Sequence, residues 1–318
     1  MSASEDRRIR GLRPPKNFVD PFAPYGSVLE DERRPDGSIE RALTVFLSGA
    51  ECPFTCSFCD LWQYTIDGPT PIGALPTQLE RVLREHAQSM PDRVKFYNAS
   101  NFFDRRAVPP TDLPRIVELT SSCKALTVES HVNTIGVSTL EFARQITGRL
   151  EVAVGLETIE PVAASMLNKR LDLTAFDAAA KFLTESDIDL RVFVLLGAPY
   201  VPAHASVEWT VRTVEYATQR GASVVSIIPV REGNGEIERL KSLGHFVPPA
   251  LRQLETALDR CMQFSSTVVT ADMWDVERLP ACESCRSERI ARMQRMNITG
   301  RREAPIACAL CDDACDAA

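Results

Sequence analysis

The sequence predicts an α/β protein built around a parallel β-sheet. Six short runs rich in apolar residues recur along the chain, at 42–48, 93–98, 125–130, 149–155, 190–196 and 222–229. Each run is nearly continuous in apolar residues, which is the pattern of a strand buried on both faces. Segments with helical spacing separate the runs, and this alternation predicts a parallel sheet covered by helices.

The helices are predicted from apolar residues that recur at intervals of three, four and seven. This spacing places one apolar face against a sheet, and it occurs at 79–86, 113–120 and 176–183. Start signals with the spacing of a capping box, or close to it, support three helices: Thr77 with Glu80, Ser138 with Glu141, and Thr174 with Asp177. Six strand–helix units in a row form either an open doubly wound sheet or a partial barrel.

The segments outside these units differ in composition. The 318 residues, 44% of them hydrophobic, suit one large domain with a small appendage. Residues 1–40, rich in Pro and Arg, are predicted to be an irregular extension. We expect a helical connection at 236–280 and a separate Cys-rich unit at 281–318.

Composition also bears on location and partners. The N-terminus lacks the apolar run of a secretory signal, and we find no apolar stretch long enough to span a membrane. We therefore expect a cytoplasmic protein, where clustered thiols more often hold metal than form disulfides. The net charge of -7 argues against a surface that broadly coats nucleic acid, but it leaves room for a local basic patch.

The ten cysteines fall into two groups and two single positions. One group is Cys52, Cys56 and Cys59, and the other gathers at the C-terminal end: Cys282, Cys285, Cys308, Cys311 and Cys315. We interpret the isolated Cys123 and Cys261 as small buried apolar side chains.

The first group directly follows the first predicted strand, at the end of the sheet where α/β folds bind ligands. A structural zinc site needs four protein ligands, and no fourth Cys or His lies nearby in sequence. Three thiolates can instead hold three irons of a [4Fe-4S] cluster and leave the fourth iron open to a small ligand. Two alternatives are zinc completed from elsewhere, for instance by His86 or His131, and a loop of thiols without metal.

The motif Cys52-x3-Cys56-x2-Cys59, with Phe58 before its last cysteine, resembles the radical S-adenosylmethionine (radical SAM) superfamily. The resemblance implies a partial (βα)6 TIM-like barrel, here over residues 41–235, and a [4Fe-4S] cluster bound by the three cysteines. It also implies that the cluster binds S-adenosylmethionine (SAM) and cleaves it reductively, with electrons from a low-potential donor such as flavodoxin or ferredoxin.

Further segments resemble the branch of the Elongator catalytic subunit and the archaeosine synthase radical subunit. They are "KFYNASNFFDRRAVP", "VESHVNTI", "EVAVGLETIEPVAASMLNKRLDL" and "LRVFVLLGAP". The resemblance implies cofactor-binding roles for residues near these strand ends: Phe58, Asn98, Ala99, Ser100, Glu129, Glu157 and Lys169, with Arg170 beside the last in a helix. This chain departs from the branch at Asn98-Ala99-Ser100, where a glycine pair is common, and at His131, where an Arg is frequent.

Simpler roles remain open for the charged residues. Glu129 and Glu157 could be solvated carboxylates at strand ends, and Lys169 and Arg170 could form a solvent-exposed helix face. His131 is either bonded to backbone at a strand end or faces the substrate as a proton donor.

The C-terminal cysteines form two C-x2-C pairs, at 282–285 and 308–311, separated by 22 residues. This spacing predicts a second metal site, either zinc or an auxiliary [4Fe-4S] cluster, in which Cys315 could replace Cys311. We hypothesise that this unit caps the open side of the barrel. The intervening segment 286–302 predicts a helix with a basic side, which is either a solvated face or a site for an anionic partner.

Three functions remain in view. The first is a radical SAM enzyme that abstracts hydrogen from a small metabolite or biosynthetic intermediate. The second is the same chemistry on a tRNA base, as in archaeosine synthesis, with a partner subunit supplying RNA contacts. The third is a non-catalytic iron–sulfur or zinc protein that serves as a redox sensor or scaffold.

Overall fold

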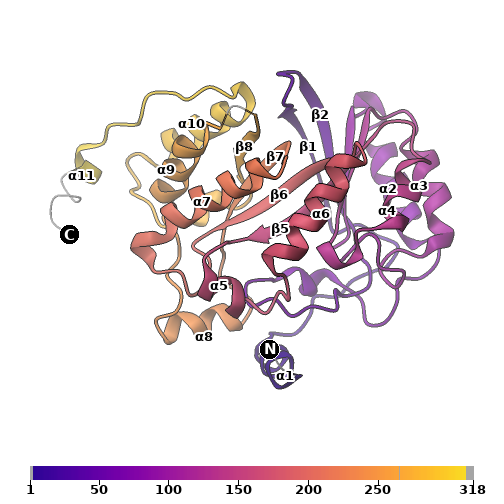
Figure 1. Ribbon diagram of the computed structural model, residues 1–318, viewed down its shortest axis with the longest axis horizontal. Coiled ribbons are helices and arrows are strands. Elements are labelled where there is room, and N and C mark those ends of the chain that lie inside the picture. The colour runs from indigo at the N-terminus through magenta and orange to yellow at the C-terminus, as the bar shows by residue number, and fades with distance from the viewer. Residues whose placement is uncertain (1–2, 265, 313–318) are drawn as a thin grey trace.

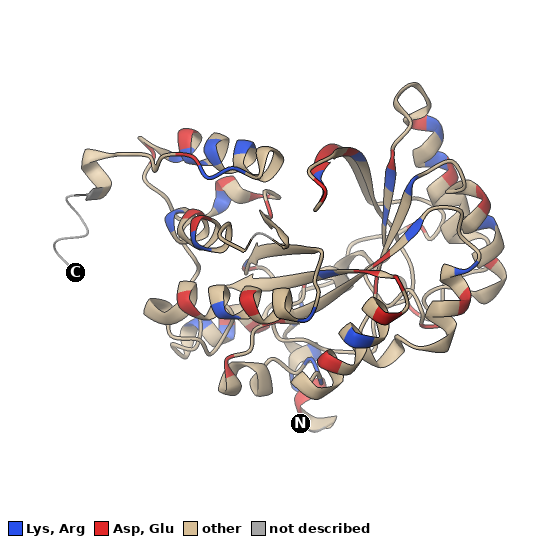
Figure 2. Cartoon of the chain, turned by 45° about the horizontal axis from the view of Figure 1, so that its top comes forward, with Lys and Arg blue, Asp and Glu red and all other residues tan. Residues whose placement is uncertain are grey.

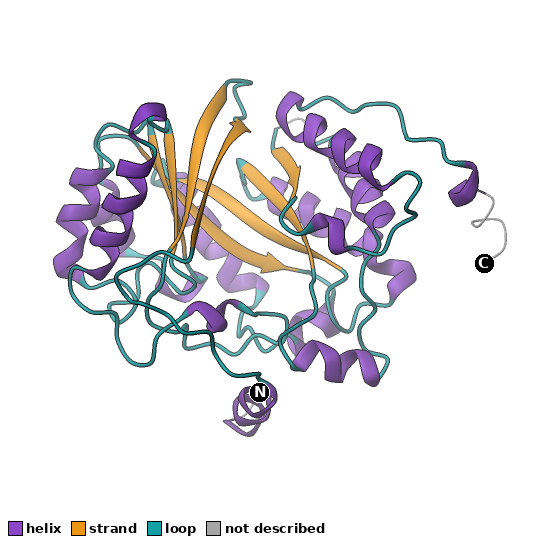
Figure 3. Cartoon of the chain, turned by 180° about the vertical axis from the view of Figure 1, so that it is seen from behind, coloured by secondary structure: helices purple, strands orange, loops and turns teal. Residues whose placement is uncertain are grey.

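A computed structural model of the protein describes residues 3–264 and 266–312. One eight-stranded sheet runs in the order β1 to β8 and curves into a partial barrel with helices outside it (Figures 1 and 3). The strands are β1 Gly26–Arg33, β2 Ile39–Phe46, β3 Arg93–Tyr97, β4 Ala125–Glu129, β5 Arg149–Glu157, β6 Asp189–Leu196, β7 Val224–Pro229 and β8 Val268–Ala271. Strands β2 to β8 are all parallel, and β1 pairs antiparallel with β2.

Helices connect the strands. They are α1 Ala3–Leu12, α2 Ala74–Glu85, α3 Leu113–Leu119, α4 Val137–Ala143, α5 Pro161–Met166, α6 Leu173–Glu185, α7 Ser206–Gln219, α8 Glu236–Ser242, α9 Leu251–Cys261, α10 Arg286–Thr299 and α11 Ala309–Asp312. Of these, α2, α3 and α6 lie where the apolar spacing predicts them. The main core lies between the sheet and its outer helices, where Phe96, Phe142 and Phe176 are fully buried. The predicted partial barrel of six strand–helix units is therefore confirmed, and the strands β1 and β8 extend it at either edge.

Two flanking segments differ from their predictions. Residues 1–40 are not irregular, because they contain α1 and β1. Strand β1 lacks an apolar signature because Glu30 and Glu32 pair with Lys95 of β3, so charged partners replace the usual apolar contacts. The segment 236–280 contains the short strand β8 as well as the expected helices.

A network of buried charges fills one end of the barrel. Glu151 of β5 is fully buried and is paired with Arg34, Arg93 and Arg191, with N–O distances of 2.9, 3.2 and 2.5 Å. Arg191 of β6 also pairs with Glu32 of β1. Since four strands separate β1 from β6 in the sheet, this ion pair crosses the interior of the barrel, and the network forms its floor.

No helix in the described part of the chain is long and apolar enough to cross a bilayer. The charged residues of the outer helices are of mixed sign, with Lys and Arg alternating with Asp and Glu (Figure 2). The strands also carry charged segments in this view, which is consistent with the ion pairs in the barrel floor.

Candidate active site

The loop that carries Cys52, Cys56 and Cys59 follows β2 and lies at the carboxyl end of the parallel strands. Two asparagine side chains from neighbouring loops hold its backbone carbonyls. The Asn168 amide donates to Thr55 O at 3.0 Å, and the Asn234 amide donates to Ser57 O at 2.9 Å and Cys59 O at 3.2 Å. The loop is therefore fixed to the segments after β5 and β7, across the mouth of the barrel.

The three thiols of this loop are partly buried. Burial raises the pKa of Cys56 to about 12, although the positive charge of Lys169 opposes this. Burial also raises the pKa of Cys52. The Phe54 N–H, the charge of Lys169 and the Asn101 amide, which lies 3.7 Å from the Cys52 sulfur, each lower this pKa but do not cancel the effect of burial. Thiols with such raised pKa values stay protonated at neutral pH until a metal displaces the proton.

Among the described residues, the cysteines of this loop do not form a group placed to hold a single metal ion. In the part of the chain that the structure describes, the tail cysteines form the only group of three or more metal-binding side chains with all ligand atoms within 4.8 Å of one another. Four thiolates around one zinc at Zn–S of about 2.3 Å stand roughly 3.8 Å apart. Cys52, Cys56 and Cys59 are not part of such a group, and three thiolates from one loop can each bond a different iron of a [4Fe-4S] cluster.

The strand ends next to the loop carry buried polar atoms without partners among the described residues. They are both amide atoms of Asn98, the hydroxyl of Ser100 and one carboxylate oxygen of Glu129. Burial raises the pKa of Glu129 to about 7, although the backbone N–H groups of Ala99, Asn98 and Ser100 lower it. Because buried polar groups are nearly always bonded, such a group indicates a place that a polar ligand completes.

Ala99 lies in the left-handed region, with φ of 52°, where glycine is favoured. This is the position at which the resembled branch commonly has a glycine pair, and here the chain keeps the same backbone shape without glycine. In this turn the backbone N–H groups of 98–100 donate to the Glu129 carboxylate, and these bonds oppose the rise of its pKa on burial.

Glu157 and Lys169 form a close ion pair beside the loop. The distance from Lys169 Nζ to Glu157 Oε1 is 2.6 Å, and the ammonium lies 5.8 Å from the Phe58 ring centroid. Burial alone would lower the pKa of Lys169, but Glu157 and the Cys56 thiol raise it above its ordinary value. Glu157 and Lys169 are therefore bonded to each other, with the loop cysteines nearby.

The structure corrects the placement of Lys169 and Arg170, which lie in the loop between α5 and α6 and not in a helix. The two side chains also diverge. Lys169 is largely buried at the site, whereas Arg170 is half-exposed and pairs with Asp6 of α1.

His131 takes the simpler of its two predicted roles. The His131 Nε2 atom lies 3.1 Å from Lys169 O, and the ring stacks on Phe54 with centroids 4.2 Å apart. The backbone N–H of His131 donates to the side-chain oxygen of Asn101. Burial and the charge of Lys169 lower its pKa to about 4, so the ring is neutral at pH 7. A neutral imidazole in these contacts positions its neighbours and is a poor proton donor.

Helix α1 contributes a residue that sequence reasoning missed. The Asp6 carboxylate accepts hydrogen bonds from Asn168 at 3.0 Å and Thr55 at 2.7 Å, and these bonds lower its pKa to about 2. The N-terminal helix is thus bonded directly to the cysteine loop. No sequence motif indicates this contact, because Asp6 and Thr55 lie 49 positions apart.

Above the charged floor, aromatic side chains face one another across the barrel. Tyr97 of β3 and Phe193 of β6 have ring centroids 6.1 Å apart, and Phe46 at the end of β2 contacts Trp274 after β8 at 5.4 Å. Tyr97, Phe193 and Phe46 are only partly buried, so solvent reaches them. This part of the interior lies between the floor and the cysteine loop.

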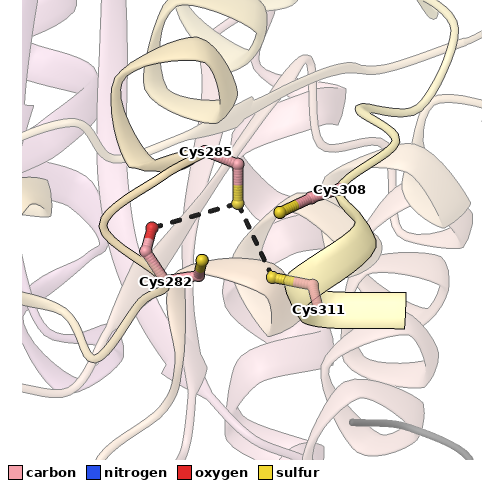
Figure 4. Close-up of side chains that lie close together, drawn as sticks. All are labelled: Cys282, Cys285, Cys308 and Cys311. Atoms are coloured by element: carbon pink, nitrogen blue, oxygen red, sulfur yellow. Dashed lines mark hydrogen bonds between the residues drawn. The ribbon is translucent and has the colours of Figure 1, made fainter. Parts of the chain in front are cut away.

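The C-terminal cysteines meet in space. Figure 4 shows Cys282 and Cys285 facing Cys308 and Cys311, and their four sulfurs lie within 4.8 Å of one another. Cys315 lies outside the described residues. Cys123 and Cys261 are buried as predicted, the former in the turn between α3 and β4 and the latter at the end of α9.

The fold is that of radical SAM enzymes. No family model and no curated protein matches the sequence, but solved structures of this fold do. Archaeal Elp3 from Methanocaldococcus infernus is 13% identical with a TM-score of 0.50, over 63% of this chain and 52% of that one. SuiB from Streptococcus suis, bound to S-adenosylmethionine, is 17% identical with a TM-score of 0.50, over 70% of this chain and 48% of that one.

A radical SAM methyltransferase from Sphaerobacter thermophilus is similar over more of its length. It is 16% identical with a TM-score of 0.52, over 86% of this chain and 82% of that one. By contrast, the chain spans only about half the length of Elp3 and SuiB. These similarities establish the fold.

Proposed function

We propose that the protein is a radical SAM enzyme that reductively cleaves SAM and abstracts hydrogen from a small organic substrate. The observation that carries this proposal is the pairing of two features at the mouth of the barrel. A fixed loop presents three thiols, and polar atoms of Asn98, Ser100 and Glu129 lie unpartnered within the described chain.

When bound, a [4Fe-4S] cluster supplies the electron that cleaves SAM to methionine and a 5'-deoxyadenosyl radical. In this proposal Cys52, Cys56 and Cys59 hold three of its irons. Asn168 and Asn234 keep their loop in place by binding its carbonyls. The protein therefore supplies orientation and shelter from water, as cofactor enzymes generally do.

The polar strand ends would bind the SAM molecule. Glu129 offers a carboxylate oxygen to the methionyl ammonium, and Asn98 and Ser100 offer an amide and a hydroxyl to its polar groups. Phe58 would pack near the adenine. Glu157, bonded to Lys169, would contact the ribose or methionyl part.

The interior favours a small substrate. The charged floor closes one end of the barrel, and Phe46, Tyr97 and Phe193 leave partly exposed aromatic surface between the floor and the cysteine loop. A bound molecule there would lie against rings that exclude water and hold a C–H bond in one position, which hydrogen abstraction needs.

The contacts of α10 weaken the case for tRNA. Its predicted basic side is occupied, because Arg289 and Arg292 are buried against Glu255 and Arg295 pairs with Glu303. A nucleic acid needs free cations to replace its counterions, and these three arginines are paired within the chain.

We propose flavodoxin or ferredoxin as the electron donor, because the cluster requires a low-potential reductant.

A first test is spectroscopic. After anaerobic reconstitution and reduction, the protein should show a [4Fe-4S] electron paramagnetic resonance signal that shifts when SAM is added, because SAM binds the open iron. Cys59→Ala should remove this signal, whereas the matched Cys123→Ala should retain it. A reduced cluster whose signal ignores SAM would instead support the non-catalytic alternative, and salt-dependent tRNA binding would revive the tRNA one.

A further inference from the structure

The tail cysteines have the geometry of a site for a single ion. The four sulfurs lie within 4.8 Å of one another, and the sulfurs of Cys285 and Cys311 are 3.6 Å apart. Around one tetrahedral zinc with Zn–S of about 2.3 Å, neighbouring sulfurs stand roughly 3.8 Å apart. A [4Fe-4S] cluster spreads its thiolates more widely, because each bonds a different iron at the cube's corners.

We propose that Cys282, Cys285, Cys308 and Cys311 bind one tetrahedral zinc ion, which clamps α10 across the open side of the barrel. All four ligands come from the protein, so the site has no open position for substrate and is structural. The inference goes beyond the proposed function and does not depend on it.

The backbone around the cysteines has a compact turn at each pair. Cys285 N–H donates to Cys282 O at 3.3 Å, and Cys311 N–H donates to Cys308 O at 2.9 Å. Each turn brings its two sulfurs to one side, and Figure 4 shows the two pairs facing each other. The two halves of a four-thiolate shell are therefore both formed, one before α10 and one at α11.

The surroundings of the site complement the negative charge of four thiolates and one divalent ion. Arg289 Nε donates to the Cys285 sulfur at 3.1 Å, and its guanidinium also bonds Ile306 O at 3.1 Å and pairs with Glu255 of α9. Hydrogen bonds to the ligands orient them and tune the site. Arg289 thereby connects the metal site to α9 and to the segment that leads to Cys308.

Arg292, one turn further along α10, extends this connection. Its guanidinium is fully buried and pairs with Glu255 at 3.0 Å and Asp259 at 2.7 Å, and it donates to the carbonyls of Glu303 and Ala304. The return segment 303–308 is therefore held along α10 and α9 before it delivers Cys308 and Cys311.

Helix α10 in turn contacts both edges of the sheet. Asn297 forms two hydrogen bonds with Ala271 of β8, at 2.9 and 2.8 Å, and Gly300 lies against the Arg33 side chain of β1. Met293 and Met296 are fully buried in the main core. Helix α10 packs against both β1 and β8, the two edge strands between which the sheet is open. An ion at the start of α10 therefore fixes the helix that closes the barrel.

The test uses the full chain with Cys52, Cys56 and Cys59 all changed to alanine, so that only the tail site can hold metal. Purified without oxygen from cells supplied with both iron and zinc, it should contain one zinc per chain and no iron or sulfide. Iron and sulfide in cluster proportions would overturn the proposal, as would a folded protein without metal.

Three further variants in the triple-alanine chain locate the ligands. Cys308→Ser should lose the zinc, whereas Cys123→Ser, a matched cysteine change away from the site, should keep it. Cys315→Ser should also keep it, and loss of zinc there would overturn the assignment of Cys311 as the fourth ligand. If Cys308→Ser fails to fold, cobalt exchanged into the parent chain gives the answer, since a tetrahedral four-thiolate spectrum is expected and an octahedral one contradicts it.

Hydrogen exchange tests the clamp. Removal of zinc by a chelator should speed amide exchange in α10, β8 and β1, while exchange in β4 on the far side stays unchanged. Equal exchange in α10 with and without zinc would overturn the clamping role.

Discussion

Replacing Glu151 with glutamine probes the charged floor of the barrel. The change keeps the size of the side chain but removes the negative charge that Arg34, Arg93 and Arg191 share. Glu151 is fully buried, so water does not reach it to compensate for the lost charge. The three guanidinium groups lose the carboxylate that they share and keep Glu32 and Glu40 as close counter-ions. Breaking a buried ion pair from one side costs about 3–5 kcal/mol.

The pKa of Glu151 gives the same magnitude by a second route. Burial alone would raise it, but Arg191, Arg93 and Arg34 lower it from 4.5 to about 2. A depression of this size corresponds to about 3 kcal/mol of stability at neutral pH. Both routes therefore predict that Glu151→Gln lowers the free energy of unfolding by several kcal/mol.

Urea denaturation followed by circular dichroism measures this loss. Glu208→Gln is the matched control, because Glu208 pairs with Arg260 and Arg212 on the surface and is half-exposed. Surface pairs contribute about 0–1 kcal/mol, so the control should unfold close to wild type. A loss below about 1 kcal/mol for Glu151→Gln would refute the view that the floor depends on this carboxylate.

Three further predictions concern Glu151, Asp6 and Glu129. Because the pKa of Glu151 is depressed in the folded protein, its stabilisation should be complete above about pH 5 and should fade as the pH falls toward 2, so the stability gap to Glu151→Gln should shrink at low pH; a constant gap would contradict this. Asp6→Ala should free α1 from the cysteine loop and increase proteolysis within the first 12 residues, whereas Asp31→Ala in β1 should not. Glu129→Gln should weaken SAM binding by roughly 10- to 100-fold in calorimetry while the iron content stays unchanged, and equal affinity would remove Glu129 from the cofactor site.

The sequence was sufficient to predict those parts of the fold and site that depend on a local pattern of residues. The six buried strands follow from continuous apolar runs, and the position of Cys52, Cys56 and Cys59 follows from the strand before them. The approach of the two C-terminal cysteine pairs was likewise predictable, because each pair forms its own turn. Strand β1 was missed because its second half is charged and its one buried side chain is Glu32, so its sequence does not resemble a buried strand.

The contacts between distant segments could not be predicted. The asparagines that hold the cysteine loop, Asn168 and Asn234, lie in loops whose course depends on the whole barrel. The arginines of α10 have the spacing of a solvent-exposed face, yet Arg289 and Arg292 are buried. Their partners Glu255 and Asp259 stand four residues apart on α9, which is a matching pattern that becomes meaningful only once the two helices are known to pack.

The most direct test of the proposed reaction is a single-turnover assay. The anaerobically reconstituted protein is reduced with dithionite in the presence of SAM, and 5'-deoxyadenosine is measured by mass spectrometry against Cys56→Ala and Cys123→Ala. The proposed function predicts 5'-deoxyadenosine from wild type and from Cys123→Ala, and none from Cys56→Ala. Product formation by Cys56→Ala, or a fully loaded and reduced wild-type cluster that binds SAM without cleaving it, would contradict the assignment.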